Sequence, residues 1–234
     1  SWGYLQVIKF MVNARWASVH ENNDGALREA AGGGLYGNSG YLVKDRYANE
    51  DVFEEMVEFL LAKGADVHAN NDEALMRAVD HGNPRIVKML LDHGADVHAR
   101  NDKALEIATR VSRFPFLSEP LLRAGADPNA NDGIALCNAC KHSEGNEDLL
   151  NLLIEYEANV HVNKDAPLRI SVKVGNRNAV NILLKADADV HAYNDQALRL
   201  AVSEYYIDTS INMVQMLLEA EANVHARHDQ ALRI

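Results

Sequence analysis

One short segment recurs along the chain at a nearly constant interval. The copy at Gly94 reads Gly-Ala-Asp-Val-His-Ala-Arg-Asn-Asp-Lys-Ala-Leu, and related copies begin at 16, 64, 125, 157, 187 and 221. In chain order the starts are 48, 30, 31, 32, 30 and 34 residues apart. A period of about 30 residues is typical of a repeat array. Each unit of such an array buries its apolar face only by stacking on its neighbours.

The period from Asn71 to Arg100 predicts a helix, a turn, a second helix and an extended loop. Asn71 and Asp72 form a turn pair, since asparagine tolerates the left-handed conformation, and Asp72 is the expected N-cap of the first helix. Pro84 suits the first turn of the second helix, and Gly94 its left-handed end. The buried stripes predicted from helical spacing are Leu75, Ala78 and Val79, then Ile86, Val87, Leu90 and Leu91.

The second half of this unit resembles the ankyrin repeat through Val87, Leu90-Leu91 and Gly94-Ala95-Asp96-Val97. The first half departs from it. The family's Thr-Pro-Leu-His is replaced at 73–76, 103–106 and 196–199, and its terminal Asn, kept at Asn129, is His elsewhere. This variant of the repeat motif, with Asn-Asp-x-Ala-Leu and Val-His-Ala, is similar to the ankyrin families of giant DNA viruses of amoebae. The resemblance implies an all-α repeat solenoid of stacked helix-turn-helix units with hairpin-like loops.

We expect a single array over residues 1–234, which is a fragment or the ordered part of something longer. Its expected parts are a partial repeat 1–21, a repeat 22–69 with an insertion at about 32–49, repeats 70–99, 100–130, 131–162, 163–192 and 193–226, and the start of a further repeat at 227–234. The insertion opens with Gly32-Gly33-Gly34, which opposes regular structure. It carries Tyr36, Tyr41 and Tyr47. It is either a partner-binding loop or a surface insertion whose tyrosines lie back on the solenoid.

Charge and composition argue against several partners. A net charge of -11 disfavours nucleic acid, which needs a cationic face, and anionic membrane surfaces. No apolar run reaches the roughly 18 to 20 residues that span a bilayer, and the first residues do not form a signal peptide. Two cysteines suggest a reducing compartment. We therefore expect an intracellular, cytoplasmic protein, in the host cytoplasm if it is viral.

Recurring histidines suggest a metal site and the Cys-x-x-Cys motif suggests a redox site. The spacing of the histidines argues against the first, and the position of the cysteines argues against the second. The histidines stand at 20, 68, 98, 161, 191 and 225. Neighbouring units lie about 8 to 10 Å apart, whereas zinc needs its nitrogens about 2 Å away. We expect these rings to bond loop backbone, with a pH-sensitive role as the alternative. Cys137 and Cys140 lie within a first helix and are expected to be buried. Without a phosphate loop or nucleophile motif, we expect no enzyme, cofactor or metal.

Arginines recur just after the leucine of the first helix, at Arg28, Arg169, Arg199 and Arg233. They predict either a structural ladder or a row that receives a partner's carboxylates. In the ladder, their expected partners are the turn carboxylates Asp72, Asp102, Asp165 and Asp195.

The ankyrin resemblance implies a protein partner, of unknown identity, on a concave face built by loop tips and first helices. Matched position by position, the candidates are Asp80, His81, Arg100, Arg110, Val111, Lys141, His142, Lys173, Tyr193, Ser203, Glu204 and Tyr205. The alternative is a structural component that self-associates through apolar repeat ends.

Overall fold

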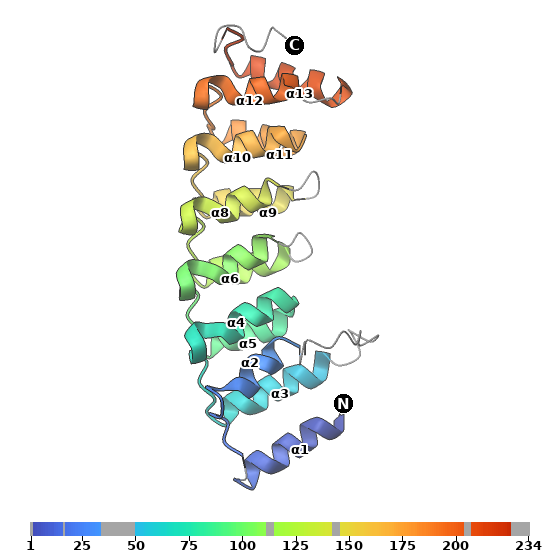
Figure 1. Cartoon of the computed structure of the whole chain (residues 1–234), viewed down its shortest axis with the longest axis vertical. Helices are drawn as coiled ribbons and strands as arrows, with labels where there is room; N and C mark the ends of the chain where they lie inside the picture. The colour runs from blue at the N-terminus through green and yellow to red at the C-terminus, as the bar shows by residue number, and fades with distance from the viewer. Residues whose placement is uncertain are drawn as a thin grey trace. The chain divides into compact units, whose positions relative to one another are not determined.

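The computed structural model describes residues 2–15, 17–33, 50–110, 115–141, 146–203 and 207–225. Helices and turns make up these segments, which contain no strand (Figure 1). Most of these helices pack against one another in pairs, as expected for an all-α repeat solenoid. The chain divides into two compact units, Ser1–Ala108 with Arg123–Ala126, and Thr109–Leu122 with Asp127–Ile234.

In the first unit, helix pairs stack in chain order. Its helices are α1 (Trp2–Asn13), α2 (Gly25–Ala31), α3 (Glu50–Ala62), α4 (Ala69–His81), α5 (Pro84–Asp92) and α6 (Ala99–Arg110), the last of which ends two residues into the second unit. Helix α2 packs against α3 and α4, α4 packs against α5, and α3 contacts α1 and α5. Here α2, α4 and α6 are the first helices of their repeats, whereas α1, α3 and α5 are second helices.

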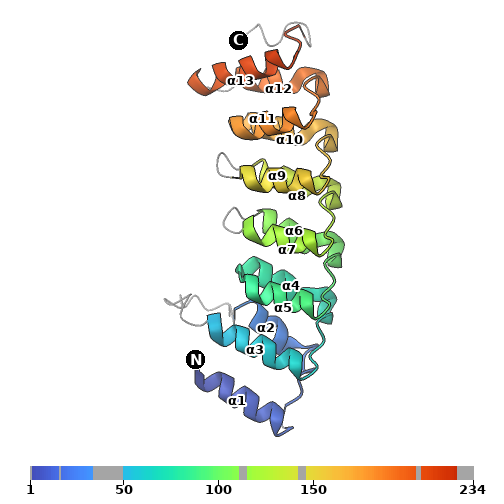
Figure 2. The same cartoon turned by 180° about the vertical axis from the view of Figure 1, so that it is seen from behind.

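The second unit repeats the arrangement. It comprises the 3-10 turn η1 (Pro115–Leu117) and helices α7 (Ser118–Arg123), α8 (Ala130–Ala139), α9 (Glu147–Glu155), α10 (Val162–Lys173), α11 (Arg177–Lys185), α12 (Ala192–Ser203) and α13 (Ile207–Glu219). Only Arg123, the last residue of α7, belongs to the first unit. The first helix α10 packs between α8 and α12, and α9 contacts α11 (Figure 2). Each first helix also packs on its own second helix, α8 on α9, α10 on α11 and α12 on α13.

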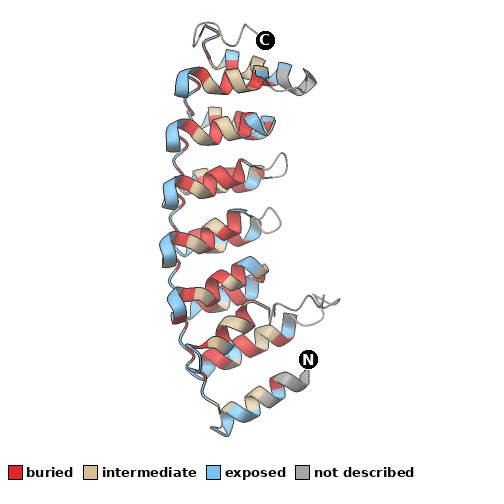
Figure 3. Ribbon diagram, in the orientation of Figure 1, coloured by how far each residue is buried: buried red, intermediate tan, exposed pale blue. Residues whose placement is uncertain are grey.

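The core follows the predicted stripes. Leu75, Ala78 and Val79 are buried in α4, and the stripe of α5 buries Ile86, Val87 and Leu90 while Leu91 is half-buried. Figure 3 shows this buried material running through the helices and exposed residues gathering at the turns. As predicted, Pro84 begins α5, where Asn83 accepts hydrogen bonds from the Arg85 and Ile86 amides at 3.0 and 3.1 Å.

The first helix begins after the predicted aspartate, but that side chain does not cap it. Asp24 directly precedes α2 and makes no side-chain capping hydrogen bond. In α4, Asn70, Asn71 and Asp72 all adopt left-handed backbone, with φ of 57°, 56° and 56°, and helical backbone begins after them. The expected extended loop is likewise replaced by a turn that runs directly into this left-handed triplet. The triplet recurs at 22–24, 100–102, 131–133, 163–165 and 193–195. The reason lies in the next repeat, to which the aspartate is bonded.

The predicted left-handed end of the second helix is confirmed. Gly94 has φ of 88°, and Gly64 and Gly125 have 87° and 100°. The later repeats place Glu157, Asp187 and Glu221 at this position with φ of 64°, 64° and 68°. A residue with a Cβ pays a steric cost there that glycine avoids.

Candidate protein-binding surface

In four of the left-handed turns, a buried aspartate joins one repeat to the next. Asp72 is 4% exposed, and its Oδ1 accepts a hydrogen bond from the Asp96 amide at 2.7 Å. The same oxygen lies 3.1 Å from Nδ1 of His68. The equivalent links join Asp24 to the Asp66 amide and His20, Asp165 to the Asp189 amide and His161, and Asp195 to the Asn223 amide and His191.

These pairs correct the prediction for the recurring histidines. Five of the six rings bond to the aspartate four residues later rather than to loop backbone, and this includes the pairing of His98 with Asp102 at 3.0 Å. Among the described residues, no group of three or more His, Cys, Asp or Glu side chains is placed to hold a metal ion. The ring therefore positions a carboxylate that the next repeat needs.

One turn makes the same link with different residues. Asn129 replaces the histidine and Gly133 replaces the aspartate. Asn129 Oδ1 accepts from the Asn159 amide at 2.7 Å, and its Nδ2 donates to the Glu157 carbonyl at 3.0 Å. A Cβ at position 133 would lie 2.7 Å from Cγ1 of Val162. The Asn–Gly pair therefore does the work of the His–Asp pair.

The recurring arginines fold back onto the left-handed turns. Arg28 donates to the carbonyls of Asn22 and Asn23 at 2.8 and 3.1 Å. Arg169 donates to the carbonyls of Asn163 and Lys164 at 2.6 and 3.2 Å. Arg199 likewise bonds the carbonyls of Tyr193 and Asn194, and Arg233 lies outside the described residues.

The predicted pairing of these arginines with the turn aspartates was wrong. The aspartates are buried and occupied by an amide and a histidine of the repeat link, as in Asp165. What the arginines reach instead are the carbonyls that the left-handed turn exposes.

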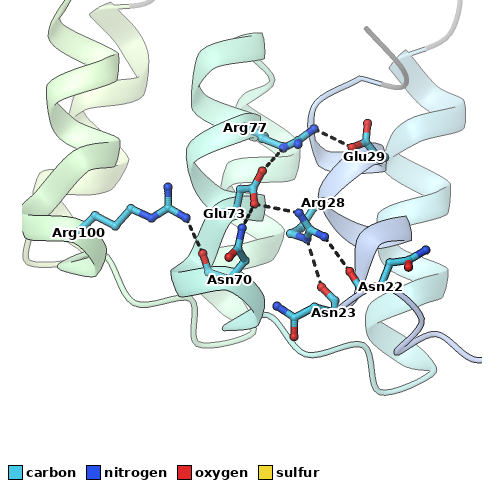
Figure 4. Close-up of polar contacts among 8 residues, drawn as sticks. All are labelled: Asn22, Asn23, Arg28, Glu29, Asn70, Glu73, Arg77 and Arg100. Carbon is cyan, nitrogen blue, oxygen red and sulfur yellow. Dashed lines mark hydrogen bonds and ion pairs between the residues drawn. The ribbon is translucent and has the colours of Figure 1, made fainter. Parts of the chain in front are cut away.

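In the first unit, the arginine row is neutralised by carboxylates (Figure 4). Glu73 on α4 accepts from Arg28 of α2 at 2.9 Å and from Arg77 at 2.7 Å, and Arg77 also pairs with Glu29 at 2.9 Å. Burial alone would raise the pKa of Glu73, but hydrogen bonds from Asn70, Arg77 and Arg28 lower it to about 2. This network ties neighbouring first helices together and leaves little net charge.

In the second unit, the corresponding region is cationic and carries an exposed aromatic ring. Tyr193 is 47% exposed, with Lys164 Nζ 4.7 Å and Arg169 Cζ 4.9 Å from its ring centroid. The distances of Lys164 and Arg169 from the ring both suit cation–π contacts. Arg169 also donates a hydrogen bond to Gln196 Oε1 at 3.1 Å. The turn of one repeat thus carries Lys164 under the Tyr193 ring of the next.

Two further lysines extend this cationic region along the first helices. Lys141 follows α8 and Lys173 ends α10, and both stand five residues after the buried leucine of their helix. Lys141 donates to Asn138 Oδ1 at 2.8 Å. Within the described part of this unit, no carboxylate forms an ion pair with Lys141, Lys164, Arg169 or Lys173.

The other predicted site residues are distributed over both units. Asp80 and Arg100 are exposed in the first unit, where Arg100 donates to the Asn70 carbonyl at 2.7 Å, and His81 is half-buried at the end of α4. Arg110 and Ser203 are exposed at the ends of α6 and α12. Val111, His142, Glu204, Tyr205 and the insertion tyrosines Tyr36, Tyr41 and Tyr47 lie outside the described residues.

Of the two cations that contact Tyr193, Lys164 was not predicted to bind a partner, and Arg169 was predicted to do so only as the alternative to a structural ladder. Lys164 occupies a turn position that is asparagine in most other repeats. This departure from the repeat pattern is the sequence feature that could have identified Lys164 as a candidate. Arg169 belonged to the arginine row, but its place beneath Tyr193 follows only from stacking.

The Cys-x-x-Cys motif is structural. Cys137 and Cys140 are free and buried, as predicted. Burial raises the pKa of both thiols, to about 12 for Cys140. A reactive cysteine needs the opposite shift, a lowered pKa.

Helices of the length and apolarity needed to cross a membrane do not occur among the described residues.

Comparison with known families agrees with this architecture. A model described as "Ankyrin repeats (3 copies)" matches residues 45–132, 105–194 and 136–228. These matches overlap and together cover most of the chain, so the protein belongs to the ankyrin-repeat family. Ankyrin repeats generally mediate protein–protein interaction and are typically non-enzymatic. A search of curated proteins gives no match.

Proposed function

We propose that this protein binds a partner protein through the turn-and-first-helix face, meaning the left-handed turns and the exposed sides of the first helices. The cationic region around Tyr193 carries the proposal. Tyrosine and arginine are enriched among residues that dominate binding energy, and here a half-exposed tyrosine lies over Lys164 and Arg169 without a neutralising carboxylate.

Variation between repeats supports the same face. The turn aspartates and histidines recur because they join repeats, so they leave little freedom for recognition. The helix positions differ from repeat to repeat, as Asp80, Arg110, Lys141, Lys173 and Ser203 show. A surface on a constant scaffold with varied side chains suits a specific protein partner.

The proposal extends to a non-catalytic role in the cytoplasm. The sequence motif of the turns is similar to that of ankyrin families of giant DNA viruses. This similarity further favours a viral protein whose partner is a host protein. The concave-face candidates, including those outside the described residues, and the insertion tyrosines remain part of this proposal.

Site-specific photo-crosslinking tests the face. A photoreactive residue would be placed at Lys173 or Ser203 on the first helices, and at Arg177 or Lys185 on the second helix α11 as a matched control. All four positions are exposed. In lysate of a candidate host, we expect one specific protein to be captured from the first-helix positions. Capture from α11 alone, or equally from all four positions, would contradict the proposed face.

A second candidate function is self-assembly through apolar side chains at the outer helices. Phe10 and Met11 are 59% and 38% exposed on α1, and Ile211 and Leu218 are 61% and 41% exposed on α13. Exposed apolar groups of this kind mark association surfaces when they are contiguous. Sedimentation velocity over a range of concentrations tests it: a single monomeric species would exclude this role, and concentration-dependent polymers would favour it.

A further inference from the structure

We infer that the cationic region of the second unit recognises an extended acidic segment of the partner, with acidic residues at every third position. This inference rests on the proposed function. The Tyr193 patch is defined as Tyr193, Lys141, Lys164, Arg169, Lys173 and Arg199. Its residues come from the turns and first helices of the repeats built on α8, α10 and α12.

The patch lies on one connected surface. Arg169 is one helical turn before Lys173 on α10, which places both on the same side of that helix. Helix α10, which carries Arg169 and Lys173, packs against α8, and Lys141 stands just after α8. Arg169 and Lys164 both meet the Tyr193 ring.

Four cations of the patch have no carboxylate partner in the described part of their unit. In the first unit, Arg28, Arg77, Arg85 and Lys88 all form ion pairs with carboxylates. Lys141, Lys164, Arg169 and Lys173 form none with any described residue. A concentrated positive surface on a chain of net charge -11 favours an acidic ligand.

A protein segment fits this patch better than nucleic acid. The second helices of the same unit and the turns that follow them present exposed acidic residues: Asp148, Glu155, Glu157, Asp187, Glu219 and Glu221. A long polyanion would be repelled by these charges, since nucleic-acid binding depends on neutralising many phosphates at once. A short acidic peptide meets only the patch, and Tyr193 offers a ring to its apolar atoms.

The repeat sets the spacing of the ligand's charges. Lys141 and Lys173 stand at equivalent positions of neighbouring repeats, as do Arg169 and Arg199. Packed helices lie about 8 to 10 Å apart. A polyproline II peptide has three residues per turn and advances about 3.1 Å per residue, so every third side chain faces the same way about 9 Å further on. Glutamates three residues apart therefore match the equivalent cations of two successive repeats.

Two isomeric peptides test the spacing on the full chain by fluorescence anisotropy. One carries glutamate at every third residue in a proline- and alanine-rich background, and the other has the same composition with its glutamates consecutive. An exposed ion pair contributes a factor of about 1.4 to 5 in affinity. We expect the spaced peptide to bind roughly threefold or more tightly. Equal affinities would overturn the inferred spacing.

The variant Lys164→Asn/Lys173→Gln tests the patch, with Arg177→Gln/Lys185→Gln as a charge-matched control on α11. Asparagine is the residue of most other repeats at position 164 and suits its left-handed backbone, with φ of 58°. We expect the first variant to bind the spaced peptide at least roughly threefold more weakly and the control to bind like the parent. Equal weakening by both would overturn the inference.

The aromatic contribution is tested separately. Tyr193→Asn removes the ring while favouring the left-handed backbone at this position, whose φ is 57°. We expect it to weaken binding, and Tyr193→Phe to retain it.

Single-stranded DNA of equal charge is the competing ligand, and tighter binding of DNA than of the spaced peptide would overturn the inference. Failure of both peptides, alongside specific crosslinking at Lys173, would reject the acidic ligand and leave the proposed binding face standing.

Discussion

Replacing Asp165 by alanine should destabilise the second unit by about 2 to 3 kcal/mol, because it removes the acceptor that joins two repeats. Asp165 is 4% exposed, and its carboxylate accepts from the Asp189 amide at 2.8 Å and from His161 at 3.0 Å. A hydrogen bond to a charged group contributes about 1.5 to 3 kcal/mol, and its loss leaves the amide without this acceptor.

The neighbouring turn supplies the compensating change. Asp165→Gly loses the same bond but relieves a left-handed backbone with φ of 56°, so it should cost only about 1 to 2 kcal/mol. In the double variant His161→Asn/Asp165→Gly, the new side chain at 161 should accept from the Asp189 amide as Asn129 accepts from Asn159. Its stability should lie within about 1 kcal/mol of the parent.

Urea unfolding followed by circular dichroism measures these differences, and hydrogen exchange at the Asp189 amide locates them. The fourth variant, His161→Asn alone, completes the cycle and gives the coupling between the two positions. The reasoning is refuted if Asp165→Ala unfolds like the parent, or if the double variant is less stable than Asp165→Gly.

Three further outcomes follow from the same structure. Glu157→Gly and Asp187→Gly should each stabilise by about 0.5 to 1 kcal/mol in urea unfolding, whereas Gly94→Ala should destabilise, since all three positions are left-handed. The pKa of Glu73 is lowered from 4.5 to about 2. Its stabilisation should be complete above pH 4.5 and decline towards pH 2, and Glu73→Gln should flatten that part of a pH titration of stability. Because burial raises the pKa of Cys140 to about 12, a thiol reagent at pH 8 should label it only after unfolding.

The sequence predicts the helices of this fold well, since their stripes depend on local spacing. Ile86, Val87 and Leu90 recur at helical intervals, and each is buried where that spacing places it. Gly94 was predictable for the same reason, because a helix end needs one left-handed residue and glycine adopts it at no steric cost. These features are properties of a single repeat.

The turns were not predictable in the same way, because their conformation depends on the next repeat. Within one period, Asp72 has the position and residue type of an N-cap. Its carboxylate instead accepts a hydrogen bond from the Asp96 amide, which belongs to the next repeat. The same limit affects the candidate surface. Lys164 and Tyr193 lie in successive turns, 29 positions apart in the sequence, and only stacking brings the cation to the ring.

The link between repeats has a consequence for how such a chain grows. Its acceptor is a side chain of one repeat, while its donor is a main-chain N–H of the next, supplied by Asp66, Asp96, Asn159, Asp189 or Asn223. Every non-proline residue carries that donor. A duplicated or transplanted repeat can therefore form this hydrogen bond with its new neighbour, because the donor does not depend on the neighbour's side chains. Array length is free to change by whole repeats while each turn keeps its own acceptor.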